Sequence, residues 1–352
     1  MQGTIGYFHH QGCCQLPLDL KRVTDTLSNL GQSPNVGATL IVSLGCEGTD
    51  HERLVEEIRA TGKPVEIIRI QELGGTSRAI QAGIDAAQHL VQQISGLQRE
   101  TVDISNVVMA IKCGASDTTS GMASNCVIGY VADKLVDLGA TVVFGETTEF
   151  LGGEHILARR AVGGENGPVG QKIYEIVNRM EARAKSIGED MRGGQPTPGN
   201  IAGGLSSIEE KSLGAIVKSG HRPIQGVLEY TDRVDDQKGL WIKDAPGREP
   251  EILTGMAATG AQLMLFSTGR GAPQGFPSMP VVKICGNPNT FERMQHDMDL
   301  NAGRIITGEK TIEEVGEEAF ELLLRVLSGQ MTKNEALGYF GSMDIFCLGP
   351  VI

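Results

Sequence analysis

AIKCGASDTTSGMASN, residues Ala110–Asn125, is the stretch that decides the fold. It continues an apolar run, Val107–Ile111, whose composition is typical of a buried strand. A lysine and a cysteine stand where the run ends, and a polar loop then leads into a helix-periodic segment that begins near Met122. Because ligands of open α/β sheets bind beyond the carboxyl ends of the strands, this strand, loop and helix predict a binding edge.

The polar loop carries side chains that suit the start of a helix. Ser116, Asp117 and Ser120 can each cap the helix that follows, and the free N–H groups at its positive end favour an anion. A capped turn beside a buried cysteine explains the same residues without any ligand. This stretch alone leaves both interpretations open.

Along the chain, short apolar runs with strand character alternate with segments of helical periodicity. The expected strands are Thr4–His9, Ala38–Leu44, Pro64–Ile70, Val107–Ile111, Thr141–Gly145, Gly226–Tyr230, Leu240–Ile242, Gln262–Phe266, Met279–Ile284 and Ile345–Leu348. The expected helices are Leu16–Leu30, His51–Thr61, Thr76–Gln93, Val169–Ile187, Ser206–Lys218 and Thr311–Leu327. This alternation predicts an α/β fold of two domains with mostly parallel sheets flanked by helices, a Rossmann-like layering. The polar stretch Leu97–Asp103 divides a first α/β domain, residues 1–98, from a larger catalytic α/β domain, residues 99–352.

Composition and charge argue against several classes of protein. The chain of 352 residues carries a net charge of −12, which disfavours a nucleic-acid-binding surface. It has no apolar run of about 18 residues and no recognisable signal peptide, so neither a membrane span nor secretion is predicted. Seven cysteines, an odd number, fit a reducing cytoplasm with thiols free or bound to metal. No G-x-G-x-x-G follows the first strand and no P-loop occurs, so nicotinamide dehydrogenase and P-loop NTPase activities lose support.

Three cysteines share one position in the expected fold. Cys13, Cys46 and Cys113 each follow the end of an expected strand, and the three thiols converge if those ends face one cleft. Histidines and acids occupy similar positions, namely His9, His10, Glu47, Glu146, Glu149, Glu154 and His155. Such side chains suit iron or zinc. Taken singly, a cysteine is more often a small buried hydrophobe, and an acid at a helix start needs no metal.

A second candidate for ligand binding is Arg270, which lies between Gly269 and Gly271 just beyond an expected strand. A guanidinium in that position can hold a carboxylate through two parallel hydrogen bonds. A glycine turn with a solvated arginine is the alternative. Lys211 and Ser212 are weaker candidates, because they also fit an exposed, charged helix face.

Eight short segments, spread from one end of the chain to the other, together resemble the altronate and galactarate dehydratase family. The segments are HHQGCCQ (His9–Gln15), LGCEG (Leu44–Gly48), KCGASD (Lys112–Asp117), SGMASN (Ser120–Asn125), ETTEFLGGEHILARRA (Glu146–Ala161), PTPGNIAGGLSSIEEKSLGA (Pro196–Ala215), TGRG (Thr268–Gly271) and DLNAG (Asp299–Gly303). The resemblance concerns the catalytic part of the family, a group that also includes the large subunit of (2R)-sulfolactate sulfo-lyase. Each segment alone is weakly specific, whereas the set is specific.

The resemblance implies a hydro-lyase that eliminates water from a sugar acid such as altronate or galactarate with the help of iron, either Fe²⁺ or an iron–sulfur cluster with one open iron position. This elimination needs a base beside the carboxylate, positive charge for the resulting anion, and a Lewis or general acid for the leaving hydroxyl. As catalytic residues we predict His9, His10, Lys112, Glu149 and Arg270. As substrate-binding residues we predict Ser116, Asp117, Ser120, Asn125 and Arg270. As metal ligands we predict Cys13, Cys46, Cys113, Glu146 and His155.

Two other functions stay open at this point. The chain could be the large subunit of a (2R)-sulfolactate sulfo-lyase that releases sulfite, or a non-catalytic metabolite-binding subunit of a two-subunit complex. Family members usually carry a small β-rich N-terminal domain or have it as a separate small subunit, and neither is visible here. We therefore expect one subunit or a shortened piece that forms a homo-oligomer and binds a small hydroxy acid, but neither nucleic acid nor membrane. Ala115 stands where the family commonly has glycine, and Cys285 and Cys347 lie outside the family pattern.

Overall fold

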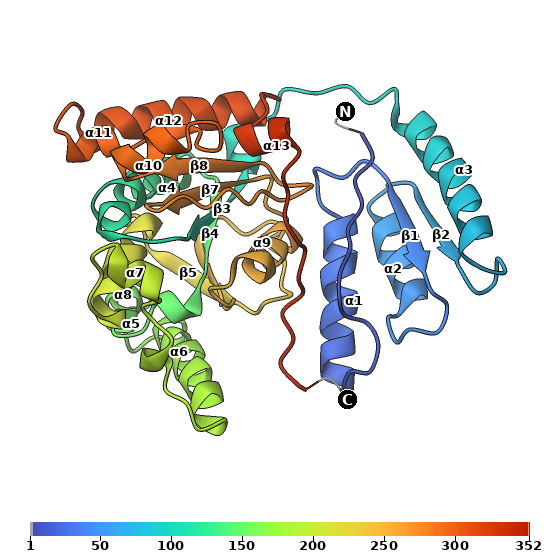
Figure 1. Ribbon diagram of the computed structural model, residues 1–352, viewed down its shortest axis with the longest axis horizontal. Coiled ribbons are helices and arrows are strands. Elements are labelled where there is room, and N and C mark those ends of the chain that lie inside the picture. The colour runs from blue at the N-terminus through green and yellow to red at the C-terminus, as the bar shows by residue number, and fades with distance from the viewer. Residues whose placement is uncertain (1–2, 351) are drawn as a thin grey trace.

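A seven-stranded, wholly parallel sheet forms the centre of the larger part of the molecule, on the left of Figure 1. The computed structural model describes residues 3–350 and 352. In spatial order the strands are β5 (Ile224–Leu228), β6 (Gly239–Lys243), β4 (Thr141–Phe144), β3 (Val108–Cys113), β7 (Leu263–Thr268), β8 (Val281–Cys285) and β9 (Leu300–Asn301). The predicted α/β fold with parallel sheets is confirmed, and the strand that opens the argument, β3, lies at the centre between β4 and β7.

Helices cover both faces of this sheet and surround a second, smaller one. In chain order they are α1 (Pro17–Gly31), α2 (His51–Ala60), α3 (Thr76–Ile94), α4 (Asn125–Asp137), α5 (Glu154–Arg160), α6 (Pro168–Ser186), α7 (Pro198–Ala202), α8 (Ile208–Ile216), α9 (Glu249–Ala258), α10 (Pro288–Arg293), α11 (Gly303–Ile306), α12 (Ile312–Leu327) and α13 (Lys333–Leu337). Within residues 3–350 and 352, no helix has both the length and the apolar composition that a membrane crossing requires.

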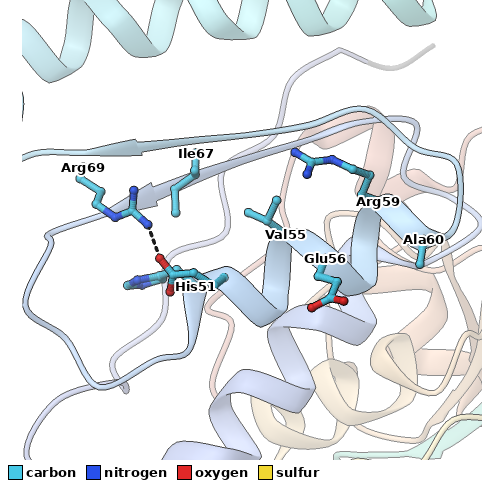
Figure 2. Close-up of a pocket in the computed structure, with 8 residues that line it drawn as sticks. His51, Val55, Glu56, Arg59, Ala60, Ile67 and Arg69 are labelled. Atoms are coloured by element: carbon cyan, nitrogen blue, oxygen red, sulfur yellow. Dashed lines mark hydrogen bonds and ion pairs between the residues drawn. The ribbon is translucent and has the colours of Figure 1, made fainter.

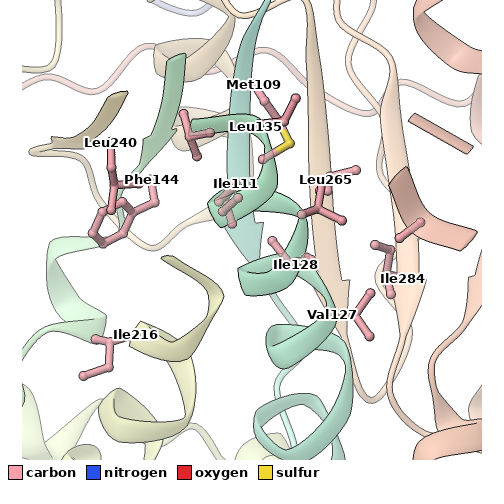
Figure 3. Packing of buried hydrophobic residues seen from close by; sticks show 14 of the residues in the cluster. Met109, Ile111, Val127, Ile128, Leu135, Phe144, Ile216, Leu240, Leu265 and Ile284 are labelled. Carbon is pink, nitrogen blue, oxygen red and sulfur yellow. The ribbon is translucent and has the colours of Figure 1, made fainter. Parts of the chain in front are cut away.

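Alternate side chains of β3 enter two separate hydrophobic cores. Met109 and Ile111 lie in the core that α4 and α12 cover, and Figure 3 shows part of this packing. Val108 and Ala110 lie in the core on the opposite face, which α9 covers. Because a parallel strand is buried on both faces, its sequence is continuously apolar instead of alternating. This double burial is why the apolar run identifies the central strand.

The smaller part of the molecule, on the right of Figure 1, is built on a two-stranded parallel sheet. Its strands are β1 (Thr39–Ser43) and β2 (Val65–Arg69), and α1, α2 and α3 pack around them. Helix α1 also packs against α9 of the larger part. Val23 and Leu30 of α1 are buried in the same core as Ile252 of α9, so the two parts share hydrophobic contacts.

Two of the predicted strands are wrong. Thr4–His9 and Ile345–Leu348 belong to no sheet in the structure. A strand needs the backbone of a neighbour, and the C-terminal segment instead bonds to a side chain, because the amides of Leu348 and Gly349 donate to the Asp19 carboxylate at 2.8 and 2.7 Å. The C-terminal segment is thus held by a side chain and partly buried, with Ile345 at 1% exposure, whereas most of Thr4–His9 is exposed.

Three lysine side chains, Lys112, Lys243 and Lys283, are fully buried in the large sheet. Lys112 and Lys283 flank Phe266 in one row across β3, β7 and β8. The Lys243 amine donates to the carbonyl of Asp232 at 2.8 Å. The Lys283 amine lies 3.3 Å from the Phe266 ring centroid and has no hydrogen-bond partner among the described residues. Burial lowers the pKa of Lys243 and that of Lys283 to about 7.

Replacing Lys283 by methionine is expected to stabilise the fold, and more at pH 6 than at pH 9. Below a folded-state pKa of about 7 the buried amine is charged without a hydrogen bond, and its burial penalty outweighs the attraction of Glu249 and Asp299. As the pH rises toward the ordinary lysine value of 10.5, the unfolded chain loses its proton too and the penalty disappears. Urea unfolding of wild type and Lys283→Met at both pH values measures this difference.

Lys243→Met is the matched control for this prediction. It should destabilise the protein, because the Asp232 carbonyl that accepts from the Lys243 amine loses its donor. A Lys283→Met protein that is destabilised at both pH values would show that the amine is not an uncompensated group.

Candidate active site

Five charged side chains gather beyond the carboxyl ends of β3 and β4. They are the glutamates Glu146 and Glu149 and the lysines Lys112, Lys211 and Lys218, and we call them the buried charge cluster. Four of them are at most 4% exposed, and the Lys211 side chain is 13% exposed. The cluster lies at the edge where the sequence predicted a binding site.

Hydrogen bonds connect the members of the buried charge cluster. The Lys112 amine bonds to Glu146 and donates to the carbonyls of Cys113 and Gly247, each at 2.9 Å. The Lys218 amine lies 2.6 Å from Glu146 Oε2 and 2.6 Å from Glu149 Oε2. The Cys113 amide donates to Glu146 Oε2 at 2.8 Å. Glu146 is thus held by two ammonium groups and one backbone amide, which leaves it little freedom to move.

The ionisation of the cluster favours an anionic ligand. Burial alone would lower the pKa values of Lys112 and Lys218, but Glu146 and Glu149 outweigh it and both pKa values rise. Burial alone would raise the pKa of Glu149, but Lys218 and Lys211 outweigh it and the pKa falls. For Glu146, burial and the charge of Glu149 raise the pKa. Within the cluster itself, three ammonium groups stand against at most two carboxylates, so these five side chains together attract anions.

Two residues at this edge have backbone conformations that side chains disfavour. Glu146 has a φ of 72° and Ala115 a φ of 49°, both in the left-handed region. Such conformations cost of order 1–3 kcal/mol each and are concentrated at functional sites. The Ala115 carbonyl accepts from the Arg270 amide at 2.9 Å, which holds the turn in place. Glycine would adopt the Ala115 conformation without strain.

The Cys113 thiol is buried among polar groups of the 110–125 stretch. It is the last residue of β3, one position earlier than the sequence suggested, and its Sγ lies 3.1 Å from Ser116 Oγ and 3.7 Å from Asn125 Nδ2. Burial and the nearby Glu149 raise the pKa of Cys113, which favours the thiol over the metal-binding thiolate. The Asn125 Oδ1 atom is buried without a partner among the described residues, so it is free to accept from a ligand.

Asp117 and Ser120 hold the loop together. The Ser120 amide donates to Asp117 Oδ1 at 2.9 Å, and the Ser120 hydroxyl donates to the Asp117 carbonyl at 2.6 Å. These bonds begin the helix with a π-helical turn, Ser120–Ser124, which continues into α4. A Cβ at Gly269 would collide with the Asp117 carboxylate. The Asp117 and Ser120 side chains are therefore engaged in bonds and contacts that hold this loop in its conformation.

The N-terminal loop with His9 and His10 is linked to the buried charge cluster indirectly, through Asp344 and Arg248. His10 Nδ1 is 3.5 Å from the Asp344 carboxylate, which pairs with Arg248 at 2.6 Å. Arg248 follows Gly247, whose carbonyl accepts from Lys112. Burial and the charge of His10 lower the pKa of His9. The two histidines thus lie on a segment connected to the cluster, but they form no direct contact with it.

The predicted metal ligands do not converge. Cys13 and Cys46 are exposed on the smaller part, on loops joined by a hydrogen bond from the Gly48 amide to the Gly12 carbonyl. Cys113 is buried at the end of β3, and His155 lies in α5. In the part of the chain that the structure describes, no three His, Cys, Asp or Glu side chains lie close enough together to hold a metal ion. The common position after strands also fails for Cys13, because residues 3–12 contain no strand.

Arg270 and Lys211 are the cations of the site that ligands can reach most easily. Arg270 is exposed, and its guanidinium lies near Gly199 at the start of α7. The Lys211 amine donates to Gln195 Oε1 at 2.6 Å and is 3.8 Å from Glu149. The segment that leads into α7 therefore adjoins both cations. Sequence reasoning gave Lys211 little weight and missed Lys218, although a spacing of seven residues places both on one helix face.

A separate groove of about 520 Å³ lies on the smaller part between α2 and β2 (Figure 2). Its lining residues are His51, Glu52, Val55, Glu56, Arg59, Ala60, Ile67 and Arg69. Arg69 bonds to Glu52 at 2.7 Å across one end of the groove. None of the predicted site residues lines this groove, so its volume is no reason to place the reaction there.

The amino-acid sequence matches two family profiles that together span most of the chain. Residues 104–349 match "D-galactarate/Altronate dehydratase, C-terminal", and residues 1–95 match "D-galactarate dehydratase/Altronate hydrolase, second domain". The two matches meet around the polar stretch that follows α3.

Three curated proteins are similar to the chain over nearly its whole length. The chain is 38% identical to the (2R)-sulfolactate sulfo-lyase subunit beta of Chromohalobacter salexigens, over 96% of this chain and 86% of that protein. It is 35% identical to the galactarate dehydratase (L-threo-forming) of Escherichia coli, over 93% of this chain and 63% of that enzyme. It is 33% identical to the altronate dehydratase of Bacillus subtilis, over 98% of this chain and 67% of that enzyme.

Removing Lys218 is expected to destabilise the protein strongly. Lys218→Met leaves Glu146 and Glu149 buried without their shared ammonium group, a loss of about 3–5 kcal/mol for a broken buried pair. Burial would then raise the pKa of Glu149 above its unfolded value. Burying a protonated carboxyl costs less free energy than burying a charged one. The free energy of unfolding of the variant should therefore fall as the pH rises and be lower at pH 8 than at pH 5.

Urea unfolding at both pH values measures this effect against a surface control. Lys185 is 65% exposed and 3.9 Å from Glu181, so Lys185→Met should cost at most about 0.5 kcal/mol. Adding Glu149→Gln to Lys218→Met should restore part of the stability at pH 8. Equal effects of Lys218→Met and Lys185→Met would mean that the buried cluster does not stabilise the fold.

Proposed function

The chain belongs to the D-galactarate/altronate dehydratase family, and we propose that it is a hydro-lyase that eliminates water from a sugar acid such as altronate or galactarate. The observation that supports this function best is the buried charge cluster, whose net positive charge lies at the carboxyl edge of the central sheet. An anionic substrate bound there loses a proton beside its carboxylate, and nearby positive charge stabilises the anion that forms.

Each proposed substrate is a 2-hydroxy acid with a leaving group on C3. A base removes the C2 proton, the electron pair forms the C2–C3 double bond, and the leaving group departs from C3. In this proposal Arg270 and Lys211 bind the carboxylate, because they are the more exposed cations. The Lys112 amine already donates hydrogen bonds to three acceptors, so it stabilises the substrate anion only through its positive charge. His10 donates a proton to the leaving hydroxyl once the N-terminal loop approaches the substrate.

Glu149 fits a different role from the one suggested by the sequence. Lys218 and Lys211 outweigh its burial and lower its pKa, so the carboxylate is a weak base. We infer that Glu149 holds Lys211 and Lys218 in place, while another group removes the C2 proton. Ser116 and Asn125 then remain the polar side chains beside the thiol that can contact substrate hydroxyls.

A second candidate function is sulfite release from (2R)-sulfolactate. The chain is 38% identical to the sulfo-lyase subunit beta and spans 86% of it, and it spans 63–67% of the two dehydratases. Removal of the C2 proton is common to both reactions, and only the group that leaves C3 differs. A small partner subunit is part of this proposal. Assays of the wild-type chain alone and with an added small subunit separate both functions from that of a non-catalytic metabolite-binding subunit.

The decisive assay supplies altronate, galactarate and (2R)-sulfolactate separately to anaerobically purified protein. Formation of a 2-keto-3-deoxy acid identifies the hydro-lyase, and release of sulfite identifies the sulfo-lyase. The hydro-lyase proposal predicts the first product from at least one sugar acid and no sulfite. Sulfite release without turnover of either sugar acid would replace it by the second candidate.

Iron is a separate proposal that rests on the family resemblance, since no group of side chains in residues 3–350 and 352 could hold a metal ion as placed. We predict that the anaerobically purified protein contains iron, and that Cys13→Ser, Cys46→Ser and Cys113→Ser each lower its iron and acid-labile sulfide content. Cys126→Ser is the control, because Cys126 is half-buried on α4 and bonds locally to the Gly121 carbonyl. Unchanged iron in all three variants would contradict these ligands.

Arg270→Lys is expected to raise KM and to lower kcat. Lysine cannot form the two parallel bonds that a guanidinium makes to a carboxylate, and the contact strengthens as negative charge moves onto the carboxylate. We expect a loss in kcat/KM of about 2–4 kcal/mol. Steady-state kinetics measure it, with Arg293→Lys at the end of α10 as the control. Wild-type kinetics of Arg270→Lys would exclude the carboxylate contact.

A further inference from the structure

Glu249 is an unpaired carboxylate beside the buried charge cluster. It is half-buried in the first turn of α9. It forms no hydrogen bond and no close ion pair with the described residues, although its charge acts on Lys112 and Lys283. The neighbouring Gly247 carbonyl accepts from the Lys112 amine at 2.9 Å, so this end of α9 lies directly on the site.

Close packing places the Glu249 carboxylate at the end of β3. A Cβ at Gly114 would collide with Glu249 Oε1 and with the Phe266 ring. The next residue, Ala115, accepts from the Arg270 amide at 2.9 Å. The Glu249 carboxylate and the backbone of Arg270 therefore both lie against the Gly114–Ala115 turn.

The other carboxylates near the site already have partners. Glu146 and Glu149 bond to Lys218, and Glu146 bonds to Lys112 as well. Asp117 accepts from Thr119 and Ser120 within its own loop. A general base has to be free to take a proton, and a carboxylate locked in ion pairs gives up its partners when it does so. Of these four carboxylates, Glu249 is the one that can take up a proton without breaking a hydrogen bond or an ion pair within the described residues.

We propose that Glu249 is the general base that removes the C2 proton, an assignment that rests on the proposed lyase function. The C2–H bond breaks, its electron pair forms the C2–C3 double bond, and hydroxide leaves C3 with a proton from the general acid as water. The enol then takes the proton of Glu249 onto C3, and its hydroxyl proton returns to the acid as the ketone forms. Glu249 and the acid are both regenerated. With sulfite as the leaving group, the proton transfers to and from Glu249 are the same.

Glu249→Gln tests the assignment with the substrate that the wild-type chain turns over. The variant removes the charge and keeps the shape, so kcat should fall about 10²- to 10⁴-fold while KM stays within about threefold of wild type. Calorimetric titration with the same substrate should show that binding is retained. Glu249→Asp should recover part of kcat, because a carboxylate is restored about one methylene farther away.

Glu313→Gln is the matched control, because Glu313 is an exposed carboxylate in the first turn of α12. Its kinetics should equal those of wild type. A Glu249→Gln protein with near wild-type kcat would overturn the assignment, and so would joint loss of binding and turnover, which would make Glu249 a binding residue. If the wild-type chain eliminates nothing from the three acids, the proposed function is wrong and the role of Glu249 falls with it. If wild type and Glu249→Gln are both active, the role assigned to Glu249 is wrong and the proposed lyase function stands.

Discussion

The pairing of Glu146 with Lys112 and Lys218 is the interaction on which the rest of the site depends. Charges that are removed from water have to be paired, and Glu146 is reached by Lys112 from β3 and by Lys218 from the end of the α8 region. The three elements are thereby fixed relative to one another at the carboxyl edge of the sheet. The left-handed backbone of Glu146, with a φ of 72°, brings its carboxylate between the two amines. The strain is compensated by these bonds, and the outcome is a rigid edge of positive potential.

The smaller part of the molecule completes this edge through the C-terminal segment. Asp19 of α1 accepts the amides of residues 348 and 349, and Asp344 connects Arg248 with His10. The N-terminal loop is therefore tied to the segment that contacts Lys112 and carries Glu249. In the proposed function, a proton donor on that loop acts at C3 of the substrate and the Glu249 carboxylate on α9 acts at C2. The arrangement suits an elimination, in which one group leaves from C3 while a proton leaves from C2.

The fold was largely predictable from the sequence, and the site only in part. Strands buried on both faces are continuously apolar, which is why β3 was identified from residues 107–111 and why the binding edge was expected after Lys112. A cysteine's position along the chain does not determine its partners, so Cys113 was grouped with exposed thiols that lie elsewhere. Lys218 resembles any helix-end lysine until tertiary packing buries it. Glu249 has no motif of its own, because its role follows from which carboxylates the fold leaves unpaired.

The most direct measurement is a crystal structure of the chain with its substrate bound. Galactarate or altronate in crystals of the Glu249→Gln variant should place the carboxylate within hydrogen-bond distance of Arg270 or Lys211. The C2 atom should lie next to residue 249, and a C3 substituent should face the N-terminal loop. Substrate bound in the groove between α2 and β2, or with its carboxylate remote from the positive edge around Lys112, would contradict the account.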